Sequence, residues 1–315
     1  LNPQDIESME ILKDPSSLAI FGVRGANGVI IITTKKAKEG QTRVNINGSF
    51  GFKRVTDKIA MVDAAGFKEL YNEQLRNEGN PEFDFTPWTG NTDWQDEIFQ
   101  TGFITNNNVS ITGASARHSF YLGAGYAYEQ GNIKHEKYSK VTLNISNDYK
   151  VTDNFKVGFQ FNGARILPAD TKSVATALRA APVAPVYNAE YGLYTTLPGF
   201  QKAQMNNPMV DVDLKANTTR AENYRASGNV YGQWDFLKNF QFKVMYSMDY
   251  ASNSSRTYTP VINVFDSSVE GNVVTLGNGK TGVKQSKETE AKVQSDYLLT
   301  YTNTWGDHSL TATAG

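Results

Sequence analysis

Apolar and polar residues alternate along most of the chain from about residue 42 onward. In residues 43–53 one set of alternate positions is apolar or small, and the other set is mainly polar. The apolar set comprises Val44, Ile46, Gly48, Phe50 and Phe52. Because successive side chains of a strand point to opposite faces, a period of two predicts a strand with one apolar and one polar face.

The same alternation recurs in several later segments. They are residues 119–128, 140–149, 155–161, 224–236, 239–250 and 291–305. Several of them exceed the usual length of strands in soluble sheets, and they match the roughly ten residues that a tilted strand needs to cross a bilayer. The pattern therefore predicts strands that cross a membrane.

The connections between these strands give an independent indication. With about nine strands assigned in order, long and short connections alternate, as they do in outer-membrane barrels. The long ones are residues 54–102, 168–219 and 251–287, which would be extracellular, and the connection 130–137 is intermediate. The short ones are residues 114–117, 150–154, 237–239 and 306–308. Aromatic residues cluster beside the short connections, as in an interfacial girdle. These are Tyr149, Phe155, Trp234, Phe236, Phe240 and Trp305.

Residues 6–36 form a different unit ahead of the alternating strands. Asp14 can cap a helical turn with Pro15 at its first position, and Gly22 can close that turn. The β-branched run at residues 29–34 predicts a buried strand. The unit is too small to fold alone, so the remainder of the chain must enclose it.

Several motifs resemble one known family. The strand at residues 7–12 and the run Phe-Gly-Val-Arg-Gly-Ala-Asn-Gly-Val at residues 21–29 closely resemble the end of the plug in SusC/RagA-like TonB-linked outer-membrane transporters. The resemblance continues through Asn-Thr-Asp-Trp-Gln-Asp at residues 91–96 and Asn-Val-Ser-Ile-Thr-Gly at residues 108–113. It covers nearly the whole chain. Pro15 and the Phe-Gly-Val-Arg step at residues 21–24 are mild departures from similar family segments.

The resemblance implies an all-β membrane fold, an antiparallel transmembrane β-barrel with the C-terminal piece of an α+β plug domain. Residues 1–36 would end the plug and residues 42–315 would begin a barrel of about twenty-two strands. The plug motif would be Arg24, Gly25, Ala26, Asn27 and Gly28. We expect the chain to be an internal fragment. Nine open strands would leave two unpaired edges, so we expect these residues alone to aggregate and not to insert.

The resemblance also implies a function: TonB-dependent active import of oligosaccharides, or peptides, as a multi-pass protein of the cell outer membrane. The implied partners are a SusD-like surface lipoprotein, TonB of the inner-membrane energising complex, the glycan or peptide ligand, and outer-membrane lipid. Two alternatives share parts of the pattern: a solitary TonB-dependent receptor for metal chelates or other nutrients, and a structural or adhesive barrel. The family motifs that extend beyond the plug, at residues 91–96 and 108–113, disfavour a solitary receptor. Residues 6–36 disfavour a structural or adhesive barrel, which would need no plug.

Composition narrows the chemistry. The chain has 39% hydrophobic residues, no cysteine and a formal net charge of −1, and its mean hydropathy is −0.46. No apolar run is long enough for a spanning helix, and the near-neutral charge argues against a nucleic-acid partner. The glycine-rich run at residues 21–29 lacks the ending of a phosphate-binding loop. His118, His135 and His308 lie far apart in the sequence. We therefore expect no enzyme activity, catalytic residue, cofactor or metal site.

Two long connections hold the candidate ligand- or partner-contacting residues. Residues 168–219 carry Tyr187, Tyr191, Tyr194 and Phe200, and the first long connection carries Trp88 and Trp94. Aromatic faces can stack on sugars or peptides. The alternative is that these aromatic residues only fold the loops upon themselves. The polar strand faces would line a lumen of mixed charge: Lys156, Gln160, Asn162, Arg225, Asn229, Gln233, Lys243 and Asp249.

Acidic residues in the long connections have simpler interpretations. Asp93, with Asp96 and Glu97 behind it, predicts the start of a helix. Residues 63–79 predict an amphipathic helix that Asp63 would cap and Gly79 would end. The pair Asp211 and Asp213 could bind a cation, but it supplies too few ligands for a calcium loop.

Overall fold

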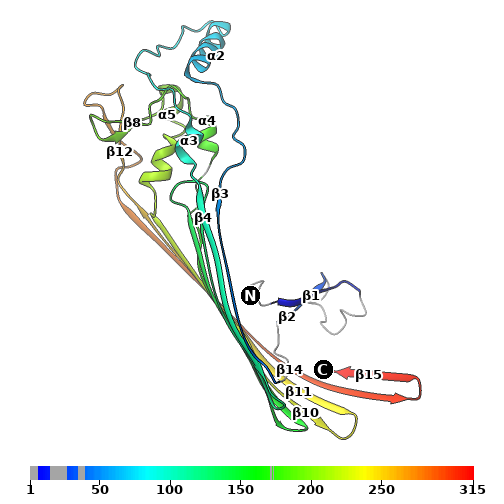
Figure 1. Cartoon of the computed structure of the whole chain (residues 1–315). Helices are drawn as coiled ribbons and strands as arrows, with labels where there is room; N and C mark the ends of the chain where they lie inside the picture. The colour runs from blue at the N-terminus through cyan, green and yellow to red at the C-terminus, as the bar shows by residue number, and fades with distance from the viewer. Residues whose placement is uncertain (1–5, 15–26, 35–39, 171, 173) are drawn as a thin grey trace.

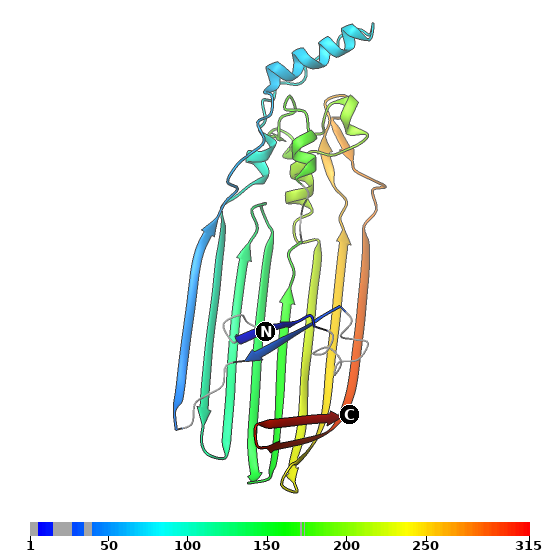
Figure 2. The same cartoon turned by 90° about the vertical axis from the view of Figure 1, so that its right-hand side faces the viewer.

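A nine-stranded antiparallel sheet forms most of the protein. The structure, a computed structural model, describes residues 6–14, 27–34, 40–170, 172 and 174–315. The strands run in chain order across the sheet, each hydrogen-bonded to the one before it (Figure 1 shows the sheet from its edge, and Figure 2 shows its face). They are β3 (Thr42–Lys53), β4 (Gly102–Ala114), β5 (His118–Gln130), β6 (Lys137–Thr152), β7 (Phe155–Leu167), β10 (Thr219–Phe236), β11 (Phe240–Thr259), β14 (Gly282–Trp305) and β15 (His308–Ala314). This meander confirms the predicted antiparallel, barrel-type architecture.

The register places the apolar positions of all these strands on one face. One row of directly opposed residues runs from β3 to β14 through Val44, Ile111, Leu122, Ile145, Phe161, Gly228, Met248 and Val293. The adjacent row, on the other face, runs through Asn45, Ser110, Gly123, Asn144, Asn162, Ser227, Asp249 and Lys292. Directly opposed residues share a face in an antiparallel pair. The sheet therefore has one apolar face and one polar face.

Burial on this sheet is the reverse of that in a water-soluble protein. On the apolar face, Ile46 is 76% exposed and Val293 is 75% exposed. On the polar face, Asn108 and Asn144 are buried. An uncovered apolar surface of this extent marks an interaction site for protein or membrane. From Ala226 to Phe236, at about 3.3 Å per residue, the apolar band of β10 measures roughly 33 Å. A tilt of about 45° reduces its height to about 23 Å, close to the height of a barrel's apolar band.

The N-terminal strands form a separate antiparallel pair, β1 (Ile6–Leu12) with β2 (Val29–Thr34). Figure 2 shows this pair in front of the sheet at mid-height, on the side toward which β14 and β15 curl. Gly28 has a φ of 94°, and a Cβ there would lie 3.2 Å from the carbonyl oxygen of Leu12, so both conformation and space favour glycine. Of the plug motif, Arg24, Gly25 and Ala26 lie outside the described residues, as does the turn expected at residues 15–22. The assignment of residues 1–36 to a plug remains a prediction.

Short and long connections lie at opposite ends of the sheet (Figures 1 and 2). Residues 115–117, 153–154, 237–239 and 306–307 form the short turns. Residues 54–101, 131–136, 168–218 and 260–281 form the connections at the other end. The last of these is shorter than the expected 251–287, because β11 and β14 stay paired as far as Thr259 opposite Gly282. Both strands are mainly polar on both faces there, apart from the opposed pair Tyr258 and Val283, so the alternation was too weak to predict this extension. Pro260 ends β11 because it has no N–H donor.

The long connections fold into an ordered cap at one end of the sheet. Their helical elements are α2 (Ala64–Asn77), α3 (Trp94–Ile98), α4 (Ala175–Arg179), α5 (Gly199–Lys202) and the π-helical turn η3 (Val210–Leu214). Their strands are β8 (Tyr187–Asn188), β9 (Leu193–Tyr194), β12 (Asn263–Phe265) and β13 (Val273–Thr275). The buried hydrophobic core lies in this cap, around Ile98, Ala181, Val183 and Leu197.

Two helix starts in the cap agree with the sequence prediction. Asp63 accepts a hydrogen bond from the backbone N–H of Gly66 and caps α2, which ends just before Gly79 at a φ of 75°. Asp93 accepts from the N–H groups of Gln95 and Asp96 and caps α3. In the described part of the chain, no helix has both the length and the apolarity to span a membrane.

The facing of the sheet predicts different effects of one charge at two positions. Val244 lies opposite Gly232 on the apolar face, and Asn229 lies opposite Ser247 on the polar face. In the intact protein reconstituted in bilayers, Val244→Arg should cost about 2–4 kcal/mol of stability near the bilayer midplane. Asn229→Arg should fold with little loss. Denaturant unfolding followed by heat-modifiable migration checks both. Equal losses at the two sites would contradict the facing.

Candidate functional site

Two of the candidate aromatic residues join the long connections in the core of the cap. Trp94 is 3% exposed, and its indole Nε1 donates to the carbonyl oxygen of Ala181 at 3.0 Å. Trp88 is buried in the same hydrophobic cluster. The backbone N–H of Gly90 donates to Val183 at 2.9 Å. These contacts tie residues 54–101 to residues 168–218, and neither indole offers its face to solvent.

Phe200 belongs to an aromatic cluster that fixes α2 onto α5. Its ring centroid lies 4.3 Å from that of Tyr71 and 5.1 Å from that of Phe83. Phe67 stacks on both Tyr71 and Phe200. Stacked and edge-to-face pairs of this kind stabilise beyond their buried area. Phe67 and Tyr71 lie on the helix that was predicted to be amphipathic, and their contacts with Phe200 help to anchor α2 to the rest of the cap.

Two of the remaining candidate tyrosines lie at a groove, which we call the tyrosine groove. It is lined by Tyr187, Tyr194, Asp213, Ile262 and Asn263. Its volume is about 690 Å³. Tyr187 is 49% exposed, and its ring meets that of Tyr194 edge-on at 5.4 Å. The groove therefore presents one exposed aromatic ring, held by a second ring, beside polar groups.

Hydrogen bonds hold the tyrosine groove in place. The hydroxyl of Tyr194 donates to Oδ2 of Asp213 at 2.6 Å, and Nε2 of His135 lies 2.7 Å from Oδ1 of the same carboxylate. Burial, followed by the hydrogen bond to Asp213, raises the pKa of Tyr194 well above its ordinary value. The phenol therefore stays protonated and remains a donor.

Asp211 and Asp213 do not act as a pair. Asp211 forms an ion pair with Lys215, one helical turn further on, whereas Asp213 binds Tyr194 and His135. Across the residues that the structure describes, no group of three or more histidine, aspartate or glutamate side chains is arranged to hold a metal ion. The cation hypothesis for Asp211 and Asp213 thus gains no support from their geometry.

Residues 260–281 complete the cap, and sequence patterns did not indicate their part in it. Tyr191 packs its ring 5.0 Å from Phe265, and its hydroxyl accepts a hydrogen bond from Asn272 at 3.0 Å. Lys202 forms an ion pair at 2.8 Å with Asp266, whose side chain is buried. Burial alone would raise the pKa of Asp266, but hydrogen bonds from Lys202 and Ser268 outweigh burial and lower it. No local motif marks Asp266, because its partner is far away in the sequence.

The polar face of the sheet carries a mixed-charge network. Arg225 pairs with Asp249 at 3.0 Å, and Asn229 donates to Gln160 at 3.4 Å. Lys243 lies 4.7 Å from the ring centroid of Tyr231, whose hydroxyl donates to Asp148. The register places the residues expected to line the lumen on this face: Lys156, Gln160, Asn162, Arg225, Asn229, Gln233, Lys243 and Asp249.

Comparisons with known proteins agree with this architecture. No family model matches the chain. It is 28% identical to the TonB-dependent receptor P3 of Formosa agariphila over 99% of the chain and 30% of that receptor. It is 29% identical to the TonB-dependent receptor SusC of Bacteroides thetaiotaomicron over 82% of the chain and 28% of SusC. The structure of the RagAB peptide transporter superposes with a TM-score of 0.79 at 18% identity, over 99% of this chain and 38% of that one.

These findings define the class of protein to which the chain is similar. The chain has the fold of a piece of a large antiparallel outer-membrane-type barrel, as in RagAB. Its sequence is similar to TonB-dependent receptors, SusC among them, so the resemblance to SusC/RagA-like transporters is confirmed. The chain spans about 30% of the length of the curated relatives it matches.

The Lys202–Asp266 pair predicts that the stability of the cap depends on pH. Because the pKa of Asp266 is lowered on folding, its contribution to stability is present above its ordinary value of about 3.9 and is lost as pH falls through the lowered value. Hydrogen-exchange protection factors of the Thr196 and Leu276 amides, which bond Phe265 and Ile262, should drop between pH 6 and pH 2.5. In Asp266→Asn, protection should be low at both pH values. An unchanged pH dependence in that variant would refute the assignment.

Proposed function

We propose that the chain is part of a TonB-dependent importer in the outer membrane that takes up oligosaccharides or peptides. The observation that carries the proposal is the reversed polarity of the sheet: an uncovered apolar face and a polar face that hold register over all nine strands. Lipid accepts such a face, because every backbone group inside the sheet is hydrogen-bonded to a neighbouring strand. The edge strands β3 and β15 would pair with further strands of the intact protein.

The β1–β2 pair supports a plugged barrel and not an open pore. It lies over one face of the sheet at mid-height, on the side toward which the sheet curls (Figure 2). We assign it to the end of a plug that fills the lumen. A plugged lumen blocks simple diffusion, so import would need movement of the plug, driven through TonB by the inner-membrane energising complex.

The cap would meet the ligand and a partner. Its buried core makes it a rigid platform, suited to a SusD-like surface lipoprotein that closes over the mouth. The tyrosine groove and the mixed-charge polar face suit a neutral or zwitterionic oligomer, either a sugar chain or a peptide. RagAB is a peptide transporter. No covalent chemistry is needed for import, and we assign none to this chain.

Purification of the intact protein from native outer membranes in mild detergent tests the partner. A surface lipoprotein that co-purifies in stoichiometric amount would support a lidded importer. Uptake of labelled oligosaccharides and peptides too large for porins, in the presence and absence of an uncoupler, tests energy dependence. A protein that comes out alone and takes up metal chelates would instead favour a solitary receptor.

Tyr187 is the groove residue whose substitution is most informative, because its ring is exposed and holds no buried contact of the cap core. Tyr187→Ala should weaken binding of the transported oligomer about 5–150-fold, as loss of one aromatic stacking partner of roughly 1–3 kcal/mol would. Tyr187→Phe is the matched control, since it keeps the ring and should bind nearly as well. Binding to the detergent-purified protein by calorimetry checks this. Equal affinity in the alanine variant would remove Tyr187 from the ligand site.

A further inference from the structure

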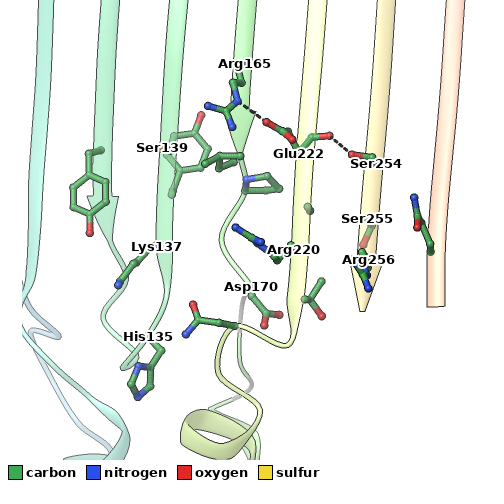
Figure 3. Close-up of a pocket in the computed structure, with 18 residues that line it drawn as sticks. His135, Lys137, Ser139, Arg165, Asp170, Arg220, Glu222, Ser254, Ser255 and Arg256 are labelled. Atoms are coloured by element: carbon green, nitrogen blue, oxygen red, sulfur yellow. Dashed lines mark hydrogen bonds and ion pairs between the residues drawn. The ribbon is translucent and has the colours of Figure 1, made fainter. Parts of the chain in front are cut away.

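A basic cluster lies on the membrane-facing side of the sheet, above its apolar band. The register assigns Lys137, Arg165, Arg220, Arg256 and Lys287 to the same face as the apolar residues. Within the nine described strands, every lysine and arginine assigned to this face lies at its long-loop end. Negative charge is scarce on this face. Within the nine described strands, the register places one acidic residue there, Glu222. This surface borders a cavity of about 580 Å³ (Figure 3).

Glu222 is already committed to other groups. Its Oε1 lies 2.5 Å from Nε of Arg165 and accepts a hydrogen bond from the hydroxyl of Tyr224 at 2.6 Å. Figure 3 shows Arg165 and Glu222 joined across β7 and β10. Asp170, another acid at the edge of the cavity, pairs with Lys172 at 2.9 Å. Glu222 also interacts electrostatically with Arg220, but one carboxylate offsets only part of the charge of five basic side chains.

Arg220 and Arg256 carry the strongest sign of a missing partner. They are directly opposite on β10 and β11, so their guanidinium groups share one face of the sheet. Like charges in directly opposed positions destabilise a strand pair unless an anion lies between them. Both side chains are exposed, and among the residues that the structure describes neither forms an ion pair.

We propose that this cluster binds the phosphate groups of a glycolipid in the outer leaflet. The cluster continues directly into the apolar band, since Arg165 lies opposite Tyr224 at the upper margin of the band. One molecule with acyl chains and an anionic headgroup therefore matches both surfaces at once. Basic residues at a membrane surface attract anionic lipids in this way, and arginine forms bidentate bonds with phosphate.

The extent of the cluster selects a large headgroup. From Tyr224 to Arg220 the strand rises about 13 Å at roughly 3.3 Å per residue, so the basic side chains extend well beyond the acyl boundary. A sugar headgroup that carries phosphate spans this distance, whereas the phosphate of a simple phospholipid stays near the boundary. The location at the long-loop end places the lipid in the outer leaflet. This inference rests on the proposed membrane-barrel function.

Lipid binding to the intact protein tests the proposal. The protein is delipidated, reconstituted in nanodiscs of phosphatidylcholine and titrated with diphosphoryl lipid A, with the same lipid after phosphate removal, or with inorganic phosphate. Arg220→Gln/Arg256→Gln should bind diphosphoryl lipid A about 30-fold more weakly, as about 1 kcal/mol for each basic residue implies. The control Lys284→Gln/Lys292→Gln removes equal charge from the opposite face and should bind like the unaltered protein.

The outcomes separate the alternatives. Loss of affinity in the arginine variant, together with weak binding of the dephosphorylated lipid, supports the proposal. Equal binding by the arginine variant and the unaltered protein overturns it. Inorganic phosphate that binds as tightly as the glycolipid overturns the lipid assignment in favour of a site for free phosphate. Heat-modifiable migration of each variant, measured beforehand, shows whether a barrel forms, so failure of the proposed function is seen separately.

Discussion

The ladder of antiparallel hydrogen bonds that joins the nine strands determines the rest of this structure. Side chains alternate with a period of two, so a slip of one residue in any strand would move its apolar set onto the polar face. The register holds from Val44 on β3 to Val293 on β14 without such a slip. This consistency creates two opposite surfaces from strands that each combine apolar and polar residues. It explains how a chain with a mean hydropathy of −0.46 can still present a continuous apolar face.

The cap is stabilised in a different way from the sheet. Its core is built as in a soluble protein, with buried indole rings and with side-chain caps on α2 and α3. Contacts between connections that are distant in sequence hold it together, such as Trp94 with Ala181 and Lys202 with Asp266. In the proposed importer, the sheet would supply the membrane-facing wall and the cap would supply a surface for recognition. The tyrosine groove lies where two of these connections meet, and the basic cluster lies below the cap on the outer side.

Sequence reasoning predicted the elements whose signal is local. The period-two alternation identified the strands, and Asp63 and Asp93 marked the helix starts that the structure shows. The extension of β11 and β14 was missed because their upper parts are mainly polar on both faces. Burial of Trp88 and Trp94 could not be told from exposure, since it depends on contacts with residues almost ninety positions away. The basic cluster could not be predicted from the sequence either, because its side chains come from several strands and are brought together only by the register of the sheet.

The central claim is that the apolar face of the sheet, which bears Met248 and Val293, contacts lipid and that the opposite, polar face does not. Spin labels placed one at a time along residues 290–295 of β14 in the intact, bilayer-reconstituted protein test it directly. Collision with oxygen, which concentrates in lipid, should peak at Ala291, Val293 and Ser295. Collision with a water-soluble nickel complex should be higher at Glu290, Lys292 and Gln294. Accessibility to both reagents without a period of two would contradict the account.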